Sequence, residues 1–232
     1  MAPGATAAYI GEMSDEEKIK DALLLGMLPH VAFDGWGRKA MAAGARDAGY
    51  AATRLDLAFP GGARDMARHF CDWGDRGMLA ALEKVDMPGL RIRERIATAV
   101  RTRLEVVTPH REAVRVLLTY LALPGNASLA TGCLYRSVDA MWRAAGDEAT
   151  DFNFYTKRAL LAGVYSATVL YWLGDESDGF AESWGFLDRR IANVMSLQSL
   201  RGRTEKALCG LPDPFRLLRG LRAGPRTSAP SG

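Results

Sequence analysis

Residues 147–190 decide the fold, and they read DEATDFNFYTKRALLAGVYSATVLYWLGDESDGFAESWGFLDRR. Charged flanks rich in aromatic residues bracket 16 uncharged residues, Ala159 to Gly174. This central run is shorter than the about 20 apolar residues that a bilayer-spanning helix needs. It is also too apolar and too rich in small residues for an ordinary surface helix. We therefore expect it in the middle of a helical domain, packed against other helices or against an apolar ligand.

One face of the predicted helix 151–173 carries small side chains at steps of three or four residues. Such a face admits a neighbouring helix closely, or it lines a tunnel for a linear apolar ligand, as pockets in helical bundles do. The residues alone leave both interpretations open. The candidate lipid-binding residues are Tyr155, Ala159, Ala162, Gly163, Ser166, Leu170 and Leu173.

The octet 151–158, DFNFYTKR, begins this helix. Asp151, Phe154, Tyr155 and Arg158 share one side of its first turns, because residues three or four apart are neighbours on a helix. One interpretation is a salt-linked helix start in which the helix dipole favours Asp151. The other is an exposed patch of aromatic residues and arginine, the composition of interface hot spots. These four are the candidate partner-binding residues.

The rest of the chain also reads as helical, because alternating strand patterns are missing from the sequence. Ser14 with Glu17 forms a capping box and predicts a helix that runs to about Leu28, just before Pro29. Three short helices then lead into a longer helical body, which is the layout of TetR-type regulators. The expected fold is an all-α, TetR-like bundle of about nine or ten helices. The further predicted helices cover about 36–48, 52–58, 63–87, 90–107, 112–123, 127–145 and 180–200.

Four regions are expected along the chain. Residues 14–70 form a degenerate helix-turn-helix region, and 71–200 form a helical body for lipid binding and dimerisation. A basic amphipathic segment, 201–222, precedes a tail, 223–232, of disordered composition. Between Asp34 and Phe70 six basic and four acidic residues leave a charge of +2, which neutralises few phosphates. DNA binding is therefore not expected, and a TetR-type ligand-responsive regulator is the alternative function.

The positive charge of the chain is concentrated at its C-terminal end. The whole 232-residue chain carries +3, but residues 201–232 carry +5 and the first 200 carry −2. Within this end, leucines and arginines of 215–222 separate on a helical wheel. A short helix of this kind lies on an anionic membrane surface, or packs on the body or on a dimer mate. The candidate membrane-contacting residues are Phe215, Arg216, Leu217, Leu218, Arg219, Leu221 and Arg222.

Catalytic and metal-binding patterns are missing from the sequence. The three histidines, His30, His69 and His110, lie far apart and form no HxxxH or ExxH pair. Three widely spaced cysteines form no CxxC motif, so reduced thiols are expected rather than a zinc site or a disulfide framework. We expect no catalytic residue, metal or cofactor, and no enzymatic activity. Residues 1–13 show neither a secretory signal nor the arginines of a transit peptide.

Three blocks between residues 151 and 190 resemble the signature of the Coq-nine family, whose members are lipid-binding accessory proteins of ubiquinone (coenzyme Q) biosynthesis. They are the octet 151–158, Tyr165-Ser166-Ala167-Thr168, and WGFLDRR at 184–190. A shorter block, HVAFDGW at 30–36, is similar to the family's N-terminal block. The resemblance implies a TetR-like fold and favours a lipid tunnel over close helix packing beside the small-residue face.

The same resemblance implies the partners. They are an isoprenoid lipid or ubiquinone precursor, a Coq-seven-type demethoxyubiquinone hydroxylase docked at the octet, a membrane surface at the C-terminal helix, and a second copy in a homodimer. Phe154 stands where the family commonly has Trp, so the hydroxylase contacts are expected to differ here. Because the family occurs in mitochondria and in bacteria, the composition of residues 1–13 favours a bacterial cytoplasm, with the protein peripheral to the inner membrane.

Overall fold

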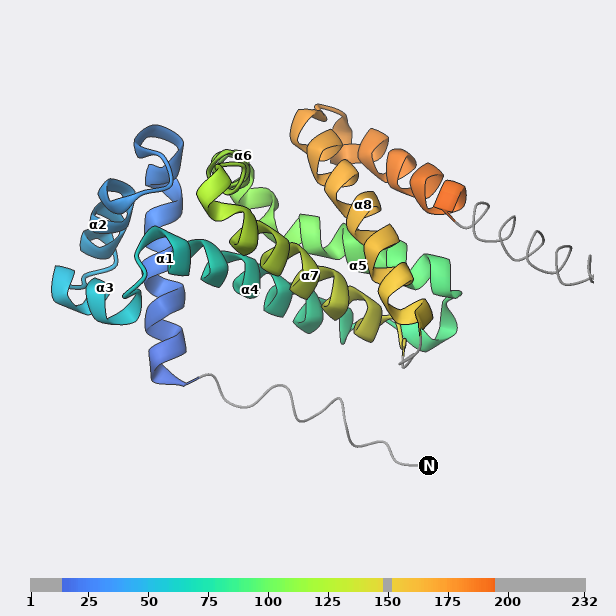
Figure 1. Ribbon diagram of the computed structural model, residues 1–232, viewed down its shortest axis with the longest axis horizontal. Helices are drawn as coiled ribbons and strands as arrows, with labels where there is room; N and C mark the ends of the chain where they lie inside the picture. The colour runs from blue at the N-terminus through green and yellow to red at the C-terminus, as the bar shows by residue number, and fades with distance from the viewer. Residues whose placement is uncertain (1–13, 148–151, 195–232) are drawn as a thin grey trace, which may run out of the picture. The chain divides into compact units, whose positions relative to one another are not determined.

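The computed structural model describes residues 14–147 and 152–194 (Figure 1). Over these residues the regular elements are helices, which confirms the expected all-α fold. A further helix covers 181–194, where the described residues end. The α-helices are α1 (Asp15–Asp34), α2 (Arg38–Asp47), α3 (Ala52–Ala58), α4 (Ala63–Leu82), α5 (Ile92–Val107), α6 (Arg111–Leu121), α7 (Ala127–Ala144) and α8 (Phe152–Gly174). Short 3₁₀ turns lie at η2 (Met87–Gly89), η3 (Thr108–His110), η4 (Pro124–Asn126) and η5 (Asp178–Phe180).

Helix α1 begins as predicted and ends later than predicted. The Ser14 hydroxyl accepts a hydrogen bond from the backbone N–H three residues on, at 3.2 Å. The expectation that the helix stops before Pro29 is wrong, since Pro29 lies inside it. A proline inside a helix costs about 3 kcal/mol, but Leu28 and Val31 on either side are buried, and this packing offsets the cost. The helix stops instead at Gly35, whose φ of 72° is one that glycine adopts without strain.

Helices α1 and α2 cross at two glycines. A Cβ on Gly44 would overlap the backbone of Met27, and a Cβ on Gly26 would meet the Gly44 carbonyl oxygen at 2.5 Å. The two backbones therefore approach as closely as they do only because both positions lack a side chain. Leu55 from α3 adds to the same buried cluster. The result is a compact three-helix region at the start of the described chain.

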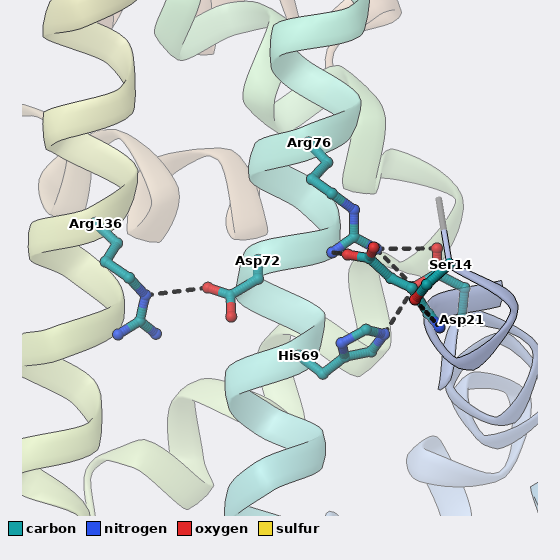
Figure 2. A network of polar contacts seen from close by, with 7 residues as sticks. Ser14, Asp21, His69, Asp72, Arg76 and Arg136 are labelled. Atoms are coloured by element: carbon teal, nitrogen blue, oxygen red, sulfur yellow. Dashed lines mark hydrogen bonds and ion pairs between the residues drawn. The ribbon is translucent and has the colours of Figure 1, made fainter. Parts of the chain in front are cut away.

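Polar contacts fasten α1 to α4 (Figure 2). The Nε2 atom of His69 lies 2.7 Å from Asp21, and Arg76 donates two hydrogen bonds to the same carboxylate at 2.7 and 2.9 Å. Burial alone would raise the pKa of Asp21, but the hydrogen bonds from His69 and Arg76 hold it below its ordinary value. Arg76 also pairs with Glu17 at 3.3 Å. Helix α1 is thus tied to α4 by charge as well as by apolar packing.

A buried ion pair joins α4, α5 and α7. Arg103 donates to Asp75 at 2.7 Å, and the Ser137 hydroxyl donates to the same carboxylate at 2.8 Å. A Cβ on Gly74 would overlap the Arg103 guanidinium, so this glycine makes room for it. Burial raises the pKa of Asp75 and raises that of the nearby Tyr165 to about 12. The three helices are held in register by a network that leaves few polar atoms unsatisfied.

The described residues up to Arg189 form one compact unit, and residue 190 begins a second. Within the first, one apolar core extends from Leu23 and Met27 of α1 to Val169 and Trp172 of α8. The expected boundaries at 70 and 200 stay predictions, and the segments 201–222 and 223–232 lie outside the described residues. Among the described helices none is by itself long and apolar enough to cross a membrane. Residues 92–121 and 124–144 reach that length and apolar composition only together, as a pair bent by 100°.

Candidate functional site on helix α8

Helix α8 buries one face and exposes another, although both are apolar. Leu161, Val164, Thr168 and Trp172 are buried, at steps of three or four residues. Trp172, with Val169 and Leu173, belongs to the apolar core that α1, α4, α6 and α7 also share. The hydroxyl of Thr168, which is fully buried, donates to the Val164 carbonyl at 2.8 Å. Apart from Thr168, the buried stripe is therefore made of aliphatic and aromatic residues rather than of the small ones.

The small-residue face lies mainly on the surface. Tyr155 is 68% exposed and Leu170 is 66% exposed, and Ala159 and Gly163 between them are exposed as well. A Cβ on Gly163 would meet no atom within 4 Å. The other three candidate lipid-binding residues differ, because Ala162 and Ser166 are half-buried and Leu173 is buried in the core. The face is thus a shallow apolar strip between two large exposed side chains.

The first turns of α8 are anchored by a buried arginine. Arg158 is only 3% exposed, and it donates to Asp139 of α7 at 2.7 Å and to Asp147 at 3.3 Å. Its guanidinium also lies 3.3 Å from the centroid of the Phe154 ring. Lys157 pairs with Asp147 at 2.7 Å. Burial alone would raise the pKa of Asp147, but the hydrogen bonds from Lys157 and Arg158 lower it below its ordinary value.

The candidate partner-binding residues therefore occupy different places. Tyr155 is exposed, and Phe154 is half-buried with its ring against Arg158. Arg158 lies inside, where it holds α8 to α7, while Asp151 lies outside the described residues. Of the three candidates that the structure describes, Tyr155 is the exposed one.

The other end of α8 is fastened through its carbonyl groups. Arg111 of α6 donates to the carbonyls of Trp172 and Asp175, and Arg115 donates to that of Leu173, each at 2.6 Å. These cations satisfy carbonyls that the end of a helix leaves without partners. The Asp175 carboxylate accepts from the Ser183 N–H at 2.9 Å and from its hydroxyl at 2.5 Å. Both ends of α8 are thus held by arginines, which bind carboxylates at its start and backbone carbonyls at its end.

No group of three metal-ligating side chains occurs among residues 14–147 and 152–194. His69 is bonded to Asp21, and His30 lies 2.6 Å from Asp47, so both rings contact carboxylates rather than each other. The candidate membrane-contacting residues 215–222 lie outside the part of the chain that the structure describes.

Comparisons with known proteins assign the family. The COQ9 family model matches residues 127–198, which include α7, α8 and the helix after it. Ubiquinone biosynthesis protein COQ9-B of Xenopus laevis is 32% identical over 221 residues, covering 90% of this chain and 75% of that protein.

The chain belongs to the COQ9 family.

Other COQ9 relatives are similar over a smaller share of their length. The proteins from Rattus norvegicus and Homo sapiens are 33% and 31% identical over 193 residues. This chain spans 62% and 60% of their lengths, and the alignment covers 80% of this chain. Among solved structures, the TetR transcriptional regulator from Nitrosomonas europaea is similar with a TM-score of 0.63, covering 75% of this chain and 97% of that one. At 20% identity this likeness confirms the TetR-like fold and nothing further.

The compartment expected from the sequence needs correction. The COQ9 relatives from Rattus norvegicus, Bos taurus, Homo sapiens and Drosophila melanogaster are all named mitochondrial proteins. The expectation of a bacterial cytoplasm, at the inner membrane, is wrong on this comparison. It rested on the composition of residues 1–13 alone, which does not decide where a chain resides.

Sequence reasoning missed the residues that position α8. Asp139, Asp147, Arg111 and Arg115 each contact α8 from another segment, and none stands in a motif. Of the four, only Asp147 lies in the charged flanks of the uncharged run that the sequence singled out. Because their partners are distant in sequence, helical periodicity carries no signal for these contacts.

Proposed function

We propose that this chain is a non-catalytic accessory protein of ubiquinone biosynthesis, one that binds an isoprenoid quinone precursor along α8 and presents it to a hydroxylase. Membership of the COQ9 family supports the pathway, since the relatives are named ubiquinone biosynthesis proteins. The observation that carries the proposal is the exposed apolar strip, where Ala159 and Gly163 leave space between Tyr155 and Leu170. A linear apolar chain fits a strip of this kind.

A carrier has a physical reason to exist in this pathway. Exposing one CH₂ group to water costs about 0.8 kcal/mol, so each five-carbon isoprene unit costs about 4 kcal/mol to lift from a bilayer. The strip on α8 supplies one apolar wall. A second copy of this chain packed along the same face would supply the other, as the expected homodimer requires. Contact of residues 215–222 with a membrane would bring the site to its lipid.

The lipid proposal is tested by what the purified protein carries. Native mass spectrometry and lipid extraction are expected to find an isoprenoid in the wild type and to find it depleted in Leu170→Glu, which places a charge on the strip. Leu57→Glu is the matched control, because Leu57 is 71% exposed on α3, far from the strip in sequence. A wild-type protein that carries no apolar ligand and does not float with liposomes would contradict the proposal.

The docking proposal has its own test. Tyr155→Ala removes an exposed aromatic ring, the side-chain type that dominates interface hot spots, and is expected to weaken capture of a demethoxyubiquinone hydroxylase by tenfold or more, at about 1.4 kcal/mol per factor of ten. Tyr135→Ala is the control, because Tyr135 is 45% exposed on α7. Equal binding by the two variants would place the partner elsewhere.

A DNA-binding regulator is the alternative, and the N-terminal helices argue against it. Arg38 of α2 donates to both carboxylate oxygens of Asp56 in α3, at 3.0 and 3.3 Å, so its charge is engaged within the protein. The exposed side of α3 also carries Leu57, an apolar residue where a recognition helix needs polar ones. A gel shift with the gene's own upstream region separates the two functions, since a specific shift would favour the regulator.

A further inference from the structure

Helices α4 and α7 run side by side with their residues in register. Asp72 of α4 pairs with Arg136 of α7 at 3.0 Å (Figure 2), and Asp75 accepts from Ser137 at 2.8 Å. Cys71 lies one helical turn before Asp75, and Cys133 lies one turn before Ser137. The same register therefore places the two cysteines at neighbouring positions of α4 and α7, where both side chains lie in one buried cluster.

The surroundings make the two sulfur atoms unequal. Both side chains are buried, and neither is bridged in this structure. The Nη2 atom of Arg136 lies 3.4 Å from Cys133 Sγ. The hydrogen bond from Cys71, with the positive charge of Arg136, lowers the pKa of the Cys133 thiol. The same hydrogen bond and burial raise the pKa of Cys71 well above its ordinary value.

Two buried cysteines on neighbouring helices also pack well as small apolar side chains. The feature that packing does not require is an arginine directed at one of them. The Arg136 side chain is 42% exposed, so it reaches from the buried Cys133 sulfur to the solvent. This arginine contact distinguishes Cys133 from Cys71, although both side chains are buried.

We propose that Cys71 and Cys133 form a dithiol that a hydroperoxide oxidises to a disulfide linking α4 to α7, with Cys133 as the attacking sulfur and Cys71 as the resolving one. The inference is independent of the lipid proposal. It adds a covalent modification site between α4 and α7, and α8 packs against α7.

The reaction balances in two steps. The Cys133 thiolate attacks one oxygen of hydrogen peroxide, so an S–O bond forms, the O–O bond breaks, and hydroxide leaves to become water. The cysteine is oxidised to a sulfenic acid and the peroxide is reduced. The Cys71 sulfur then attacks Cys133 Sγ, the S–S bond forms as the S–O bond breaks, and the departing hydroxide takes the Cys71 proton as a second water.

The test uses the full chain with Cys209→Ala, so that two thiols remain. After treatment with equimolar hydrogen peroxide, the protein is denatured and alkylated. The expected product has lost about 2 Da and takes up no alkylating reagent. Its digest contains a peptide pair linked through residues 71 and 133, which dithiothreitol separates into two peptides. Both thiols remaining alkylatable, or cross-links only between chains, would overturn the proposal.

Single-cysteine variants test the roles of the two sulfurs. Cys71→Ser is expected to accumulate a sulfenic acid on Cys133 that dimedone traps, at least about tenfold faster than Cys133→Ser does on Cys71. Arg136→Met is expected to slow disulfide formation by about threefold or more, because it removes the cation beside Cys133. Arg143→Met, which removes an exposed arginine of α7, is the control. Equal rates in the two single-cysteine variants would contradict the assigned roles, and circular dichroism verifies that each variant is folded.

Discussion

Replacing Arg158 with methionine is expected to loosen the first turns of α8. The change removes the hydrogen bonds to Asp139 and Asp147 but keeps an unbranched side chain of similar length. Removing one partner of a buried ion pair typically costs about 3–5 kcal/mol, because the other charge is left buried without its counter-ion. Asp139 keeps Arg143 at 2.8 Å and Asp147 keeps Lys157 at 2.7 Å. We therefore expect the lower end, about 3 kcal/mol of unfolding free energy.

Urea denaturation followed by circular dichroism measures this loss. With a urea dependence of about 2–3 kcal/mol per molar, a loss of 3 kcal/mol moves the midpoint down by about 1–1.5 M. Arg143→Met is the matched control. This arginine pairs with the same Asp139, four residues before it on α7, but its side chain is 72% exposed. An exposed pair of that kind contributes about 0.3–0.5 kcal/mol.

Two outcomes would refute the reasoning. If Arg158→Met and Arg143→Met unfold within about 0.5 kcal/mol of each other, the burial of Arg158 does not set its energetic weight. If Arg158→Lys is as stable as the wild type, one charge without the planar fork is sufficient, and the two-carboxylate geometry is unimportant. We expect Arg158→Lys to fall between the other two variants.

Two further predictions concern glycines and acid. Gly44→Ala is expected to destabilise the protein by about 2 kcal/mol or more in thermal unfolding, because the added Cβ meets the Met27 backbone. Gly163→Ala is expected to stabilise it by about 0.5–1 kcal/mol, since the added Cβ enters open space. A change of the same sign in both variants would contradict the packing argument. Burial would raise the pKa of Asp175, but hydrogen bonds from Ser177 and Ser183 hold it well below its ordinary value. The stability it contributes is therefore complete above about pH 4, the unfolded-state value, and is lost as the pH falls below it. Asp175→Asn is expected to flatten this acid limb in urea titrations at several pH values, and an unchanged limb would contradict the assignment.

The helix positions followed from local sequence signals, and the exceptions have physical causes. The capping serine, Ser14, was readable because a helix cap depends on neighbouring residues. Pro29 misled because its cost is local while the burial that offsets it is tertiary. Helix 52–58 was predicted with its observed bounds, since Pro60 and two glycines follow it directly.

The face that α8 buries was not readable from periodicity. Leu161 and Trp172 on one side and Ala159 and Leu170 on the other are all apolar, so the hydrophobic pattern does not choose between them. The choice is made by the neighbouring helices, whose large side chains pack against the large side of α8. The sequence also left open whether Arg158 pairs within the protein or faces a partner, because its carboxylate partners lie 11 and 19 residues away.

These anchors explain how α8 can leave an apolar face uncovered. A helix whose stability depended on all its apolar residues would have to bury the strip between Tyr155 and Leu170. Here Arg158 fixes one end, and Arg111 with Arg115 fixes the other through the last carbonyls. With both ends held and the large side packed, the small side adds little to folding. Its residues are therefore free to be selected for what they bind.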